Sequence, residues 1–414
     1  MPRIEGQGTF ELLSGATLTV GSATLTMDMG VDITKPGQFT QFGEVRADPQ
    51  LGSDAKFRNQ GRWTWRAGAI RFPQGAESPV ENIDSFTADC GSCQLRSDFL
   101  NQGVANILDT LVLAEPGVDF INRGFCSLTG FINDATSNQE GKFVNSGILS
   151  RIGAASQSII STTLDNSGLV EASQGILNIT GPIVQYSGGG LHGGRWRVNA
   201  GAIMTFGGRP ISFVARGVEV DIDGAWNEFR PTLNRGTLGG RGLIRSPGMI
   251  NEGNVKPGRS PGRLSIEGNF TQAAPDGELQ IELAGTTSET QHDVLAVTGN
   301  VSLGGTLRLI LLDGFLPAPE DVFTVITAAS VSGDFANVIV PTGLEVIVEP
   351  TATSVRLRVT CPADFNHDRA VDFFDYLDFV VEFAGATPLA DFNEDSVIDF
   401  FDYLDFVSAF AAGC

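Results

Sequence analysis

The chain has 414 residues, which is long enough for two or three domains with hydrophobic cores. Glycine is abundant, at 51 residues, while only 18% of residues are charged and the net charge at pH 7 is −21. This charge disfavours nucleic acids and anionic membrane surfaces as partners, because both are bound through Lys and Arg. The sequence contains no apolar run of the roughly 18–20 residues that span a membrane, and no signal-peptide core follows Met1.

An apolar residue followed closely by Asn-x-Gly recurs along the first 253 residues. Most steps between these motifs fit one or several multiples of about 21–23 residues, and short alternating runs lie between them. A fixed period of this size predicts a right-handed parallel β-solenoid over residues 1–253, in which each repeat forms one coil. A β-sandwich with coincidental Asn-Gly turns is the alternative. The motifs begin at Asn59, Asn101, Asn122, Asn145, Asn166, Asn234 and Asn251.

The Asn-x-Gly motif suits the corner of such a coil. Gly allows a positive φ there, while Asn tolerates left-handed geometry and can bond to the nearby backbone. Strands of neighbouring coils pair at the usual spacing of a sheet, about 4.8 Å. We therefore expect Asn101, Asn122, Asn145 and Asn166 to lie at this spacing in successive coils.

Three cysteines fall inside the predicted solenoid, at Cys90, Cys93 and Cys126. The Cys-x-x-Cys spacing of the first two also occurs in zinc and redox sites. Neither a second ligand pair nor a thioredoxin-like βαβ pattern accompanies it here. We expect Cys126 to pair with one of the other two and to leave one thiol over.

Recognisable catalytic motifs are missing from the sequence. The best candidates are Asp221 and Asp223, which alternation would place on one face of a strand, with His192 and Arg195 within about two coils. Carboxylate pairs serve as acid and base in glycoside hydrolysis. Asp at a strand end more often caps a turn, so we favour a non-catalytic solenoid. A polysaccharide lyase or glycoside hydrolase is the alternative.

From residue 254 to residue 360 the period lapses and the apolar alternating runs become longer, as in GELQIELAG and GGTLRLILLDG. An open solenoid end needs a cover, because unpaired strand edges template aggregation. We expect this β-rich segment to cap the solenoid. The run NVKPGRSPGRLSIEGNFTQ resembles the C-terminal part of autotransporter-passenger β-helices. This resemblance implies a related fold and says nothing of the route of secretion.

The segment from Cys361 to Cys414 carries about half of the charge imbalance and repeats DFFDYLDFV after 27 residues. Each copy follows an acidic run, so that oxygen ligands fall at positions 1, 3, 5, 9 and 12 of a loop, with a backbone carbonyl at position 7. This set suits Ca²⁺, which takes six to eight oxygen ligands. The predicted ligands are Asp364, Asn366, Asp368, Ala370, Asp372 and Asp375 in the first loop and Asp391, Asn393, Asp395, Val397, Asp399 and Asp402 in the second.

Over its whole length this segment resembles the bacterial dockerins that begin CPADFN and end in Gly-Cys. The resemblance implies two EF-hand-like loop-helix units that bind two Ca²⁺ ions. It also implies attachment to a cohesin-like or cell-surface protein. Position 6, usually Gly because the turn needs a positive φ, is Arg369 in the first loop and Ser396 in the second. Val371 and Ile398, at position 8, are expected to pair across a short β-bridge.

The helices that follow the loops carry more apolar surface than a module of this size can bury. Asp375, Asp378 and Glu382 form one charged stripe, and part of the remaining surface must form a core between the two repeats. Positions 10 and 11 of a dockerin repeat help to choose its partner. The resemblance therefore implies partner contacts by Phe373, Phe374, Phe400 and Phe401.

Cys361 and Cys414 bracket the dockerin-like segment, so a disulfide between them would close its ends. In the chain-entropy model a loop of this size adds roughly 4 kcal/mol of stability. Such a disulfide indicates an extracellular or cell-surface location. The sequence thus predicts an exported, non-catalytic structural or adhesion-type solenoid, attached by a Ca²⁺-dependent tail to a protein partner, with a polysaccharide as a further candidate ligand.

Overall fold

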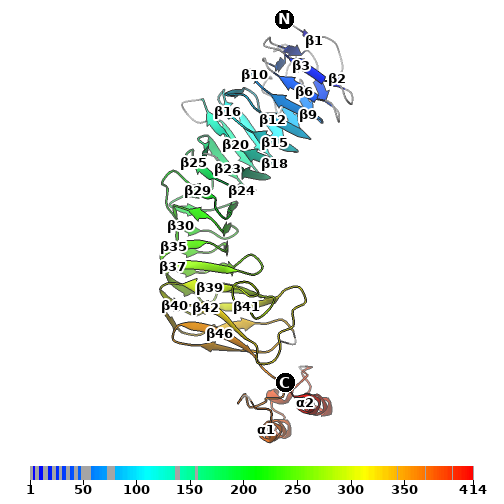
Figure 1. Cartoon of the computed structure of the whole chain (residues 1–414), viewed down its shortest axis with the longest axis vertical. Coiled ribbons are helices and arrows are strands. Elements are labelled where there is room, and N and C mark those ends of the chain that lie inside the picture. Colours follow the sequence, from blue (N-terminus) through cyan, green and yellow to red (C-terminus); the bar gives the residue numbers. More distant parts are fainter. Residues whose placement is uncertain are drawn as a thin grey trace. The chain divides into compact units, whose positions relative to one another are not determined.

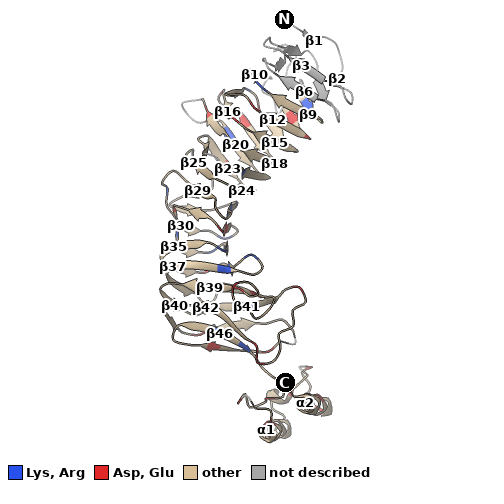
Figure 2. Cartoon of the chain, in the orientation of Figure 1, with Lys and Arg blue, Asp and Glu red and all other residues tan. Residues whose placement is uncertain are grey.

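The computed structural model describes residues 57–71, 80–135, 140–153, 157–342, 344–368, 370–393 and 395–413, and the backbone of seven strands within residues 3–47. The chain divides into two compact units, Met1–Met249 and Ile250–Cys414. The described part is mainly β and ends in two helices, as the sequence predicts (Figure 1). Charged residues are sparse along the strands (Figure 2).

The strands of the first unit follow a repeat of three along most of the chain. Each strand pairs in parallel with its counterpart in the next coil, so that successive strands enter three different sheets in turn. This is the arrangement of a β-solenoid, in which one coil supplies one strand to each sheet. Parallel pairing agrees with the predicted parallel β-solenoid and excludes a β-sandwich, whose sheets are antiparallel.

Two sheets lie entirely within the first unit. Sheet A has 11 strands in the order β1 (Arg3–Ile4), β4 (Leu25–Met27), β7 (Val45–Ala47), β10 (Ala69–Arg71), β13 (Cys93–Leu95), β16 (Thr110–Leu113), β19 (Phe131–Asp134), β22 (Gln157–Ile160), β25 (Ile176–Ile179), β29 (Ile203–Thr205) and β32 (Ala225–Trp226). Sheet B has eight, in the order β2 (Thr9–Leu12), β5 (Gly30–Ile33), β8 (Phe57–Asn59), β11 (Val80–Asn82), β14 (Phe99–Asn101), β17 (Asp119–Asn122), β20 (Lys142–Asn145) and β23 (Thr163–Asn166).

The third side of the coil is sheet C, and sheet D begins after sheet B has ended. In the first unit, sheet C comprises β3 (Thr17–Val20), β6 (Gln38–Gln41), β9 (Arg62–Trp65), β12 (Ser85–Ala88), β15 (Val104–Ile107), β18 (Phe125–Leu128), β21 (Ile148–Arg151), β24 (Leu169–Ala172), β28 (Arg195–Val198), β31 (Glu219–Ile222) and β34 (Thr237–Gly240). Sheet D starts with β26 (Tyr186–Ser187), β27 (Gly190–Leu191), β30 (Ile211–Val214), β33 (Phe229–Asn234) and β35 (Leu243–Asn251).

A buried ladder of asparagine side chains runs along sheet B. In each step the Nδ2 group of one Asn donates to the Oδ1 atom of the next, at 2.7–2.8 Å. Each of these Nδ2 groups also donates to a backbone carbonyl of the next coil, as Asn122 does to Ile148 at 2.9 Å. The predicted stacking of Asn-x-Gly motifs is confirmed. The ladder comprises Asn59, Asn82, Asn101, Asn122, Asn145 and Asn166, all fully buried.

Two positions depart from the predicted ladder. Asn82 belongs to it although no Gly follows two residues later, and it explains the double step of 42 residues from Asn59 to Asn101. Asn234 keeps the local turn, since the Gly236 N–H donates to its Oδ1 atom at 3.1 Å. Its register neighbour is Val214, however, so Asn234 lies outside the side-chain ladder.

Close packing, and not the predicted positive φ, requires glycine at these corners. Among the described corners, Gly103, Gly124, Gly147 and Gly168 do not have a positive φ. A Cβ atom on Gly124 would lie 2.2 Å from the carbonyl oxygen of Gly103 in the preceding coil. The other three would meet backbone oxygens at 2.1–2.3 Å. Any side chain would therefore push neighbouring coils apart.

Aromatic rings fill the interior behind sheet B. Phe99, Phe120 and Phe143 occupy equivalent positions in successive strands and are fully buried. Their ring centroids lie 4.9 and 5.1 Å apart, with the ring planes within 10° of parallel. Because strand residues alternate between the two faces of a sheet, one large apolar side chain per coil suffices to cover this side of the core.

The cysteine pairing differs from the prediction. Cys90 and Cys93 form a disulfide, with their Cα atoms 5.4 Å apart, so the expected bond from Cys126 to one of them is wrong. The two meet across the tight turn between β12 and β13, whereas Cys126 lies two coils further on, in β18. Cys126 is a fully buried free thiol, and burial raises the pKa of that thiol, which keeps it protonated.

The second unit continues parallel pairing with longer coils and ends in antiparallel strands. In sheet C, β36 (Asn254–Pro257), β38 (Glu278–Leu283), β41 (Thr306–Leu311) and β44 (Asn337–Ile339) are parallel. Sheet D contains β37 (Arg263–Gln272), β39 (Val294–Val297), β40 (Asn300–Ser302), β42 (Val322–Thr327), β43 (Ser330–Ser332), β46 (Ser354–Val359) and β45 (Val346–Pro350). The pairs β42–β46 and β46–β45 are antiparallel. The lapse of Asn-x-Gly after residue 253 thus marks longer coils and not the end of parallel pairing.

The chain ends in α1 (Phe373–Ala384), the short 3-10 helix η2 (Pro388–Ala390) and α2 (Phe400–Ala412). The predicted tail, residues 361–414, and the predicted cap, residues 254–360, fall in the same unit. No helix in the described residues is long and apolar enough to cross a membrane.

Candidate functional site in the C-terminal loops

The first acidic loop is held together by hydrogen bonds from its backbone N–H groups to its own side-chain oxygens. The Oδ1 atom of Asp364 and that of Asn366 each accept a bond from the Asp368 N–H, both at 3.0 Å. Asp375, from the first turn of α1, is fully buried and accepts from the N–H groups of Asn366 at 3.1 Å and Asp372 at 2.8 Å. The loop and the helix start are therefore a single hydrogen-bonded unit.

The second loop repeats this geometry. Asp402 is fully buried and accepts from the N–H groups of Phe392, Asn393 and Asp399, at 2.8, 3.2 and 2.8 Å. Burial alone would raise the pKa of Asp402, but these N–H groups outweigh it and hold the pKa below its usual range. Ser396 has a φ of 67°, the left-handed turn expected at position 6. Arg369, its counterpart, lies outside the described residues.

Asp375 does not belong to an exposed charged stripe on the first helix, as the sequence predicts, because its side chain is fully buried at the helix start. Asp372 and Asp375 form a capping box at the start of α1. The Asp372 side chain accepts from the backbone N–H of Asp375, and the Asp375 side chain accepts from the backbone N–H of Asp372. Asp378 is exposed on the same helix, and Glu382 accepts a bond from Thr387. Asp375 thus caps the start of α1, where the unpaired N–H groups and the helix dipole favour a carboxylate.

The oxygen-rich composition of both loops fits a hard cation. In the second loop the Oδ2 atom of Asp391 accepts from the Ser396 N–H at 2.9 Å, whereas its Oδ1 atom is buried without a hydrogen-bond partner. An orphaned carboxylate oxygen of this kind is what a Ca²⁺ ligand presents. In this conformation, however, no three His, Cys, Asp or Glu side chains of the described residues converge as a metal-binding group.

The two repeats meet through their helices and not through the predicted β-bridge. The described residues show no bridge between Val371 and Ile398. Instead Phe379 and Phe406, both fully buried, stack with centroids 4.0 Å apart and planes 9° from parallel. The hydroxyls of the equivalent residues Tyr376 and Tyr403 lie 3.2 Å apart. The aromatic pair at the seventh helix position of each repeat, which sequence reasoning did not single out, forms the core.

The predicted contact residues are outside this core. Phe373, Phe374, Phe400 and Phe401 are 63–64% exposed, in the first turns of α1 and α2. A soluble domain rarely leaves four large aromatic side chains in contact with water unless they serve an interaction. Their exposure excludes the alternative in which they fill the module's own core.

The residues considered for catalysis are engaged elsewhere. Asp221 accepts from Arg197 at 3.0 and 3.2 Å, and Asp223 accepts from the Arg241 N–H at 2.7 Å. His192 lies 3.3 Å from the Ser187 carbonyl oxygen. These contacts are those of ion-paired or turn-forming residues.

No known protein family matches the chain, and no curated protein is significantly similar to it. The resemblances to dockerins and to autotransporter passengers therefore remain predictions from the sequence motifs.

Cys361 is 2% exposed, while Cys414 lies outside the described residues. A disulfide between the two remains a prediction. Peptide mapping of protein made in an oxidising compartment, without reductant, should recover Cys361 and Cys414 in one linked pair. Recovery of both as alkylated free thiols would contradict it, and the linked Cys90–Cys93 peptide provides the internal control.

Proposed function

We propose that the chain is an exported, non-catalytic β-solenoid whose C-terminal helical segment attaches it to a protein partner when Ca²⁺ is bound. The observation that carries this proposal is the exposure of four phenylalanines in two equivalent helix starts, beside a core that is already complete without them. Hot spots of protein interfaces are rich in such aromatic side chains. A cohesin-like or cell-surface protein is the partner that the dockerin resemblance favours.

The remaining features support the same assignment. Parallel strands joined through a full coil are right-handed in almost all known cases, which favours a right-handed solenoid. A disulfide such as Cys90–Cys93 persists outside the reducing cytosol, which favours export. Asp221 and Asp223 have other partners, so no observation favours a polysaccharide-degrading activity.

Calcium would be held by the oxygen atoms of the two acidic loops. Asp364, Asn366, Asp368, Asp372 and Asp375 would supply side chains in the first loop, with the Ala370 carbonyl. Their equivalents from Asp391 to Asp402, with the Val397 carbonyl, would do so in the second. The carboxylates of a loop repel one another, and a bound Ca²⁺ ion would attract all of them. The ion would therefore hold each loop against the start of its helix.

Calorimetry should therefore detect two Ca²⁺ sites in the full chain. Asp368→Ala and Asp395→Ala should each abolish one of them, because position 5 supplies a ligand and both side chains are exposed. Asp378→Ala, also exposed but outside the loops, is the matched control and should keep both. The absence of any heat or of any Ca²⁺-dependent change in circular dichroism would exclude the calcium sites.

The double substitution Phe374→Ser with Phe401→Ser should abolish partner capture and leave Ca²⁺ binding unchanged. Neither side chain is a ligand or part of the core, so the melting temperature in saturating Ca²⁺ should stay within about 2 °C. Phe379→Ser is the opposite control, because it removes a fully buried ring and should cost about 3–5 kcal/mol. A double variant that melts like Phe379→Ser would instead assign Phe374 and Phe401 to the core.

A further inference from the structure

The outer face of sheet C carries an apolar stripe, formed by Val104, Phe125, Ile148 and Leu169. They are the first residues of β15, β18, β21 and β24, and each is the register partner of the next. Val104, Phe125 and Ile148 are 42%, 36% and 37% exposed, whereas the second residue of each of these strands is fully buried. Single exposed apolar residues are common on soluble proteins, but a contiguous row of them marks a surface that another molecule covers.

The stripe stands out from the polar row beside it. Because side chains alternate along a strand, the third residues of the same strands also face outward. In β18 and β21 these are Ser127 and Ser150, whose side chains are much shorter than those of Phe125 and Ile148. The Ser127 Oγ atom donates to the Oδ1 atom of Asn106 at 2.7 Å. Phe125 and Ile148 are therefore the protruding residues at the middle of this face.

Charged residues of opposite sign lie at equal distances on either side of the stripe. Arg62 starts β9 and Glu219 starts β31, each four strands from the point midway between Phe125 and Ile148. Both are register neighbours of the row that contains the stripe. The complete row is Arg62, Ser85, Val104, Phe125, Ile148, Leu169, Arg195 and Glu219.

This row is complementary to itself when it is read in the opposite direction. A two-fold axis parallel to the strands, through the midpoint of the row, places Phe125 against the partner's Ile148 and Arg62 against the partner's Glu219. Symmetry repeats each of these contacts. A shift by one coil would instead bring Arg62 against the partner's Arg195, and solenoids running in the same direction would bring Arg62 beside the partner's Arg62. Like charges disfavour both arrangements, so the charges select one register.

We propose that the first unit pairs with a second copy of this chain through the outer face of sheet C, with the two solenoids antiparallel and their apolar stripes in contact. Sheets pack face to face in this way at about 10 Å, with their strands aligned within about 30°. Eight strands of four residues give a face of about 34 by 13 Å, or roughly 900 Å² for both copies. This area is below that of stable complexes, so the pair should be weak. The interface is independent of the C-terminal attachment.

Sedimentation equilibrium of the full chain tests the pairing. The double variant Phe374→Ser with Phe401→Ser is the background, so that contacts of the C-terminal segment do not contribute. In this background the chain should pass from monomer to dimer with a dissociation constant of about 1–100 µM, the range of a weak interface. Phe125→Glu and Ile148→Lys should each weaken the dimer at least tenfold, because each places two buried charges in the apolar stripe.

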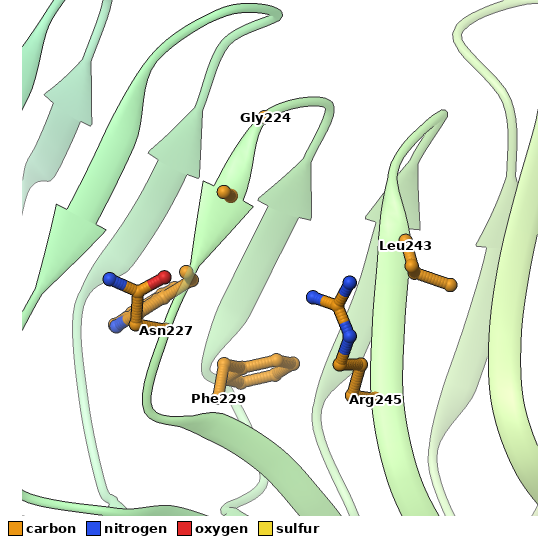
Figure 3. Close-up of a pocket in the computed structure, with 7 residues that line it drawn as sticks. Gly224, Asn227, Phe229, Leu243 and Arg245 are labelled. Carbon is orange, nitrogen blue, oxygen red and sulfur yellow. The ribbon is translucent and has the colours of Figure 1, made fainter.

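An equimolar mixture of the Phe125→Glu and Ile148→Lys chains should dimerise again. In the mixed pair the introduced carboxylate faces the introduced amine, and the other half of the stripe keeps its native contact. Recovery would also show that both variants are folded. Leu243→Glu is the matched control and should change the affinity less than twofold. Leu243 is 37% exposed, like Ile148, but lines a hollow of about 190 Å³ beside β33 and β35 of sheet D (Figure 3).

A charge exchange tests the register. Arg62→Glu should weaken the dimer at least fivefold, because it places two carboxylates together at both ends of the interface. Adding Glu219→Arg to the same chain should restore the original affinity within twofold. The proposal is overturned if the chain is monomeric at about 500 µM, if Leu243→Glu acts like Phe125→Glu, if the mixture stays monomeric, or if Arg62→Glu has no effect. Binding of a polysaccharide by a monomeric chain, abolished by Phe125→Glu, would likewise overturn it and assign the stripe to a glycan.

Discussion

Replacing Asn122 by Ala should destabilise the first unit by about 3–5 kcal/mol, although the side chain touches no ligand. Asn122 is fully buried, accepts from the Nδ2 group of Asn101 at 2.7 Å and donates to Asn145 at 2.8 Å and Ile148 at 2.9 Å. The substitution removes all three bonds and leaves buried polar atoms without partners. Each such atom costs about 1–3 kcal/mol.

Thermal unfolding of the full chain followed by circular dichroism provides the measurement for Asn122→Ala. For a unit of this size the loss corresponds to a fall in melting temperature of roughly 10 °C. Asn122→Asp is the more specific variant, because it keeps the shape and the acceptor while removing both donors, and it should be destabilised at least as much. Arg123→Ala, at the exposed position of the same corner, should melt within about 2 °C of the wild type. Equal melting temperatures of Asn122→Ala and Arg123→Ala would show that the asparagine ladder does not contribute to the stability of the first unit.

The coil repeat was predictable because the same steric problem recurs at every corner. Asn-x-Gly satisfies it in most coils, and the spacing of these motifs reveals the period. Asn82 is not followed by the motif glycine, because its corner continues with Ile83 and Asp84. The glycine that packs against this corner is Gly103, in the next coil. The sequence pattern thus identified the position of the corner, but it attributed the glycine to a positive φ. The actual reason is the close approach of a carbonyl oxygen from the preceding coil, which only the structure shows.

The candidate sites divide in a similar way. The acidic loops and exposed phenylalanines are local repeats and could be located from the sequence. The role of Asp375 could not, because a carboxylate on a predicted helix looks solvated until the loop whose N–H groups it accepts from has been placed.

A buried carboxylate in the second unit should make its stability fall as the pH rises. Asp293 is 1% exposed and accepts from the Gly262 N–H at 2.8 Å and the Glu282 N–H at 2.9 Å. It thereby ties the turn of the SPGRL run to β38. Burial raises the pKa of Asp293 from its ordinary value to about 7, an effect that the two N–H groups reduce and that the charge of Glu282 increases.

The sign of this effect follows from proton binding. Between pH 4 and pH 7 the folded state holds a proton on Asp293 that the unfolded chain has released, so the stabilisation is complete below about pH 4 and lost by about pH 7. The penalty for the ionised carboxylate grows by about 3 kcal/mol between pH 5 and pH 8. Burial lowers the pKa of the neighbouring His292, which acts in the opposite direction below pH 6.5. The wild type must therefore be compared with a variant at each pH.

Asp293→Asn should remove this dependence. The amide can still accept from Gly262, but its NH₂ group would face the Glu282 N–H, so at pH 5 the variant should be less stable than the wild type by about 1–3 kcal/mol. At pH 8 the variant should be as stable as the wild type or more stable, because it carries no buried charge. Denaturant unfolding at both pH values measures the two differences, and Asp334→Asn, an exposed carboxylate of the same unit, is the control that should show neither. If the free-energy difference between wild type and Asp293→Asn is the same at pH 5 and pH 8, Asp293 titrates normally and the two N–H groups compensate fully for its burial.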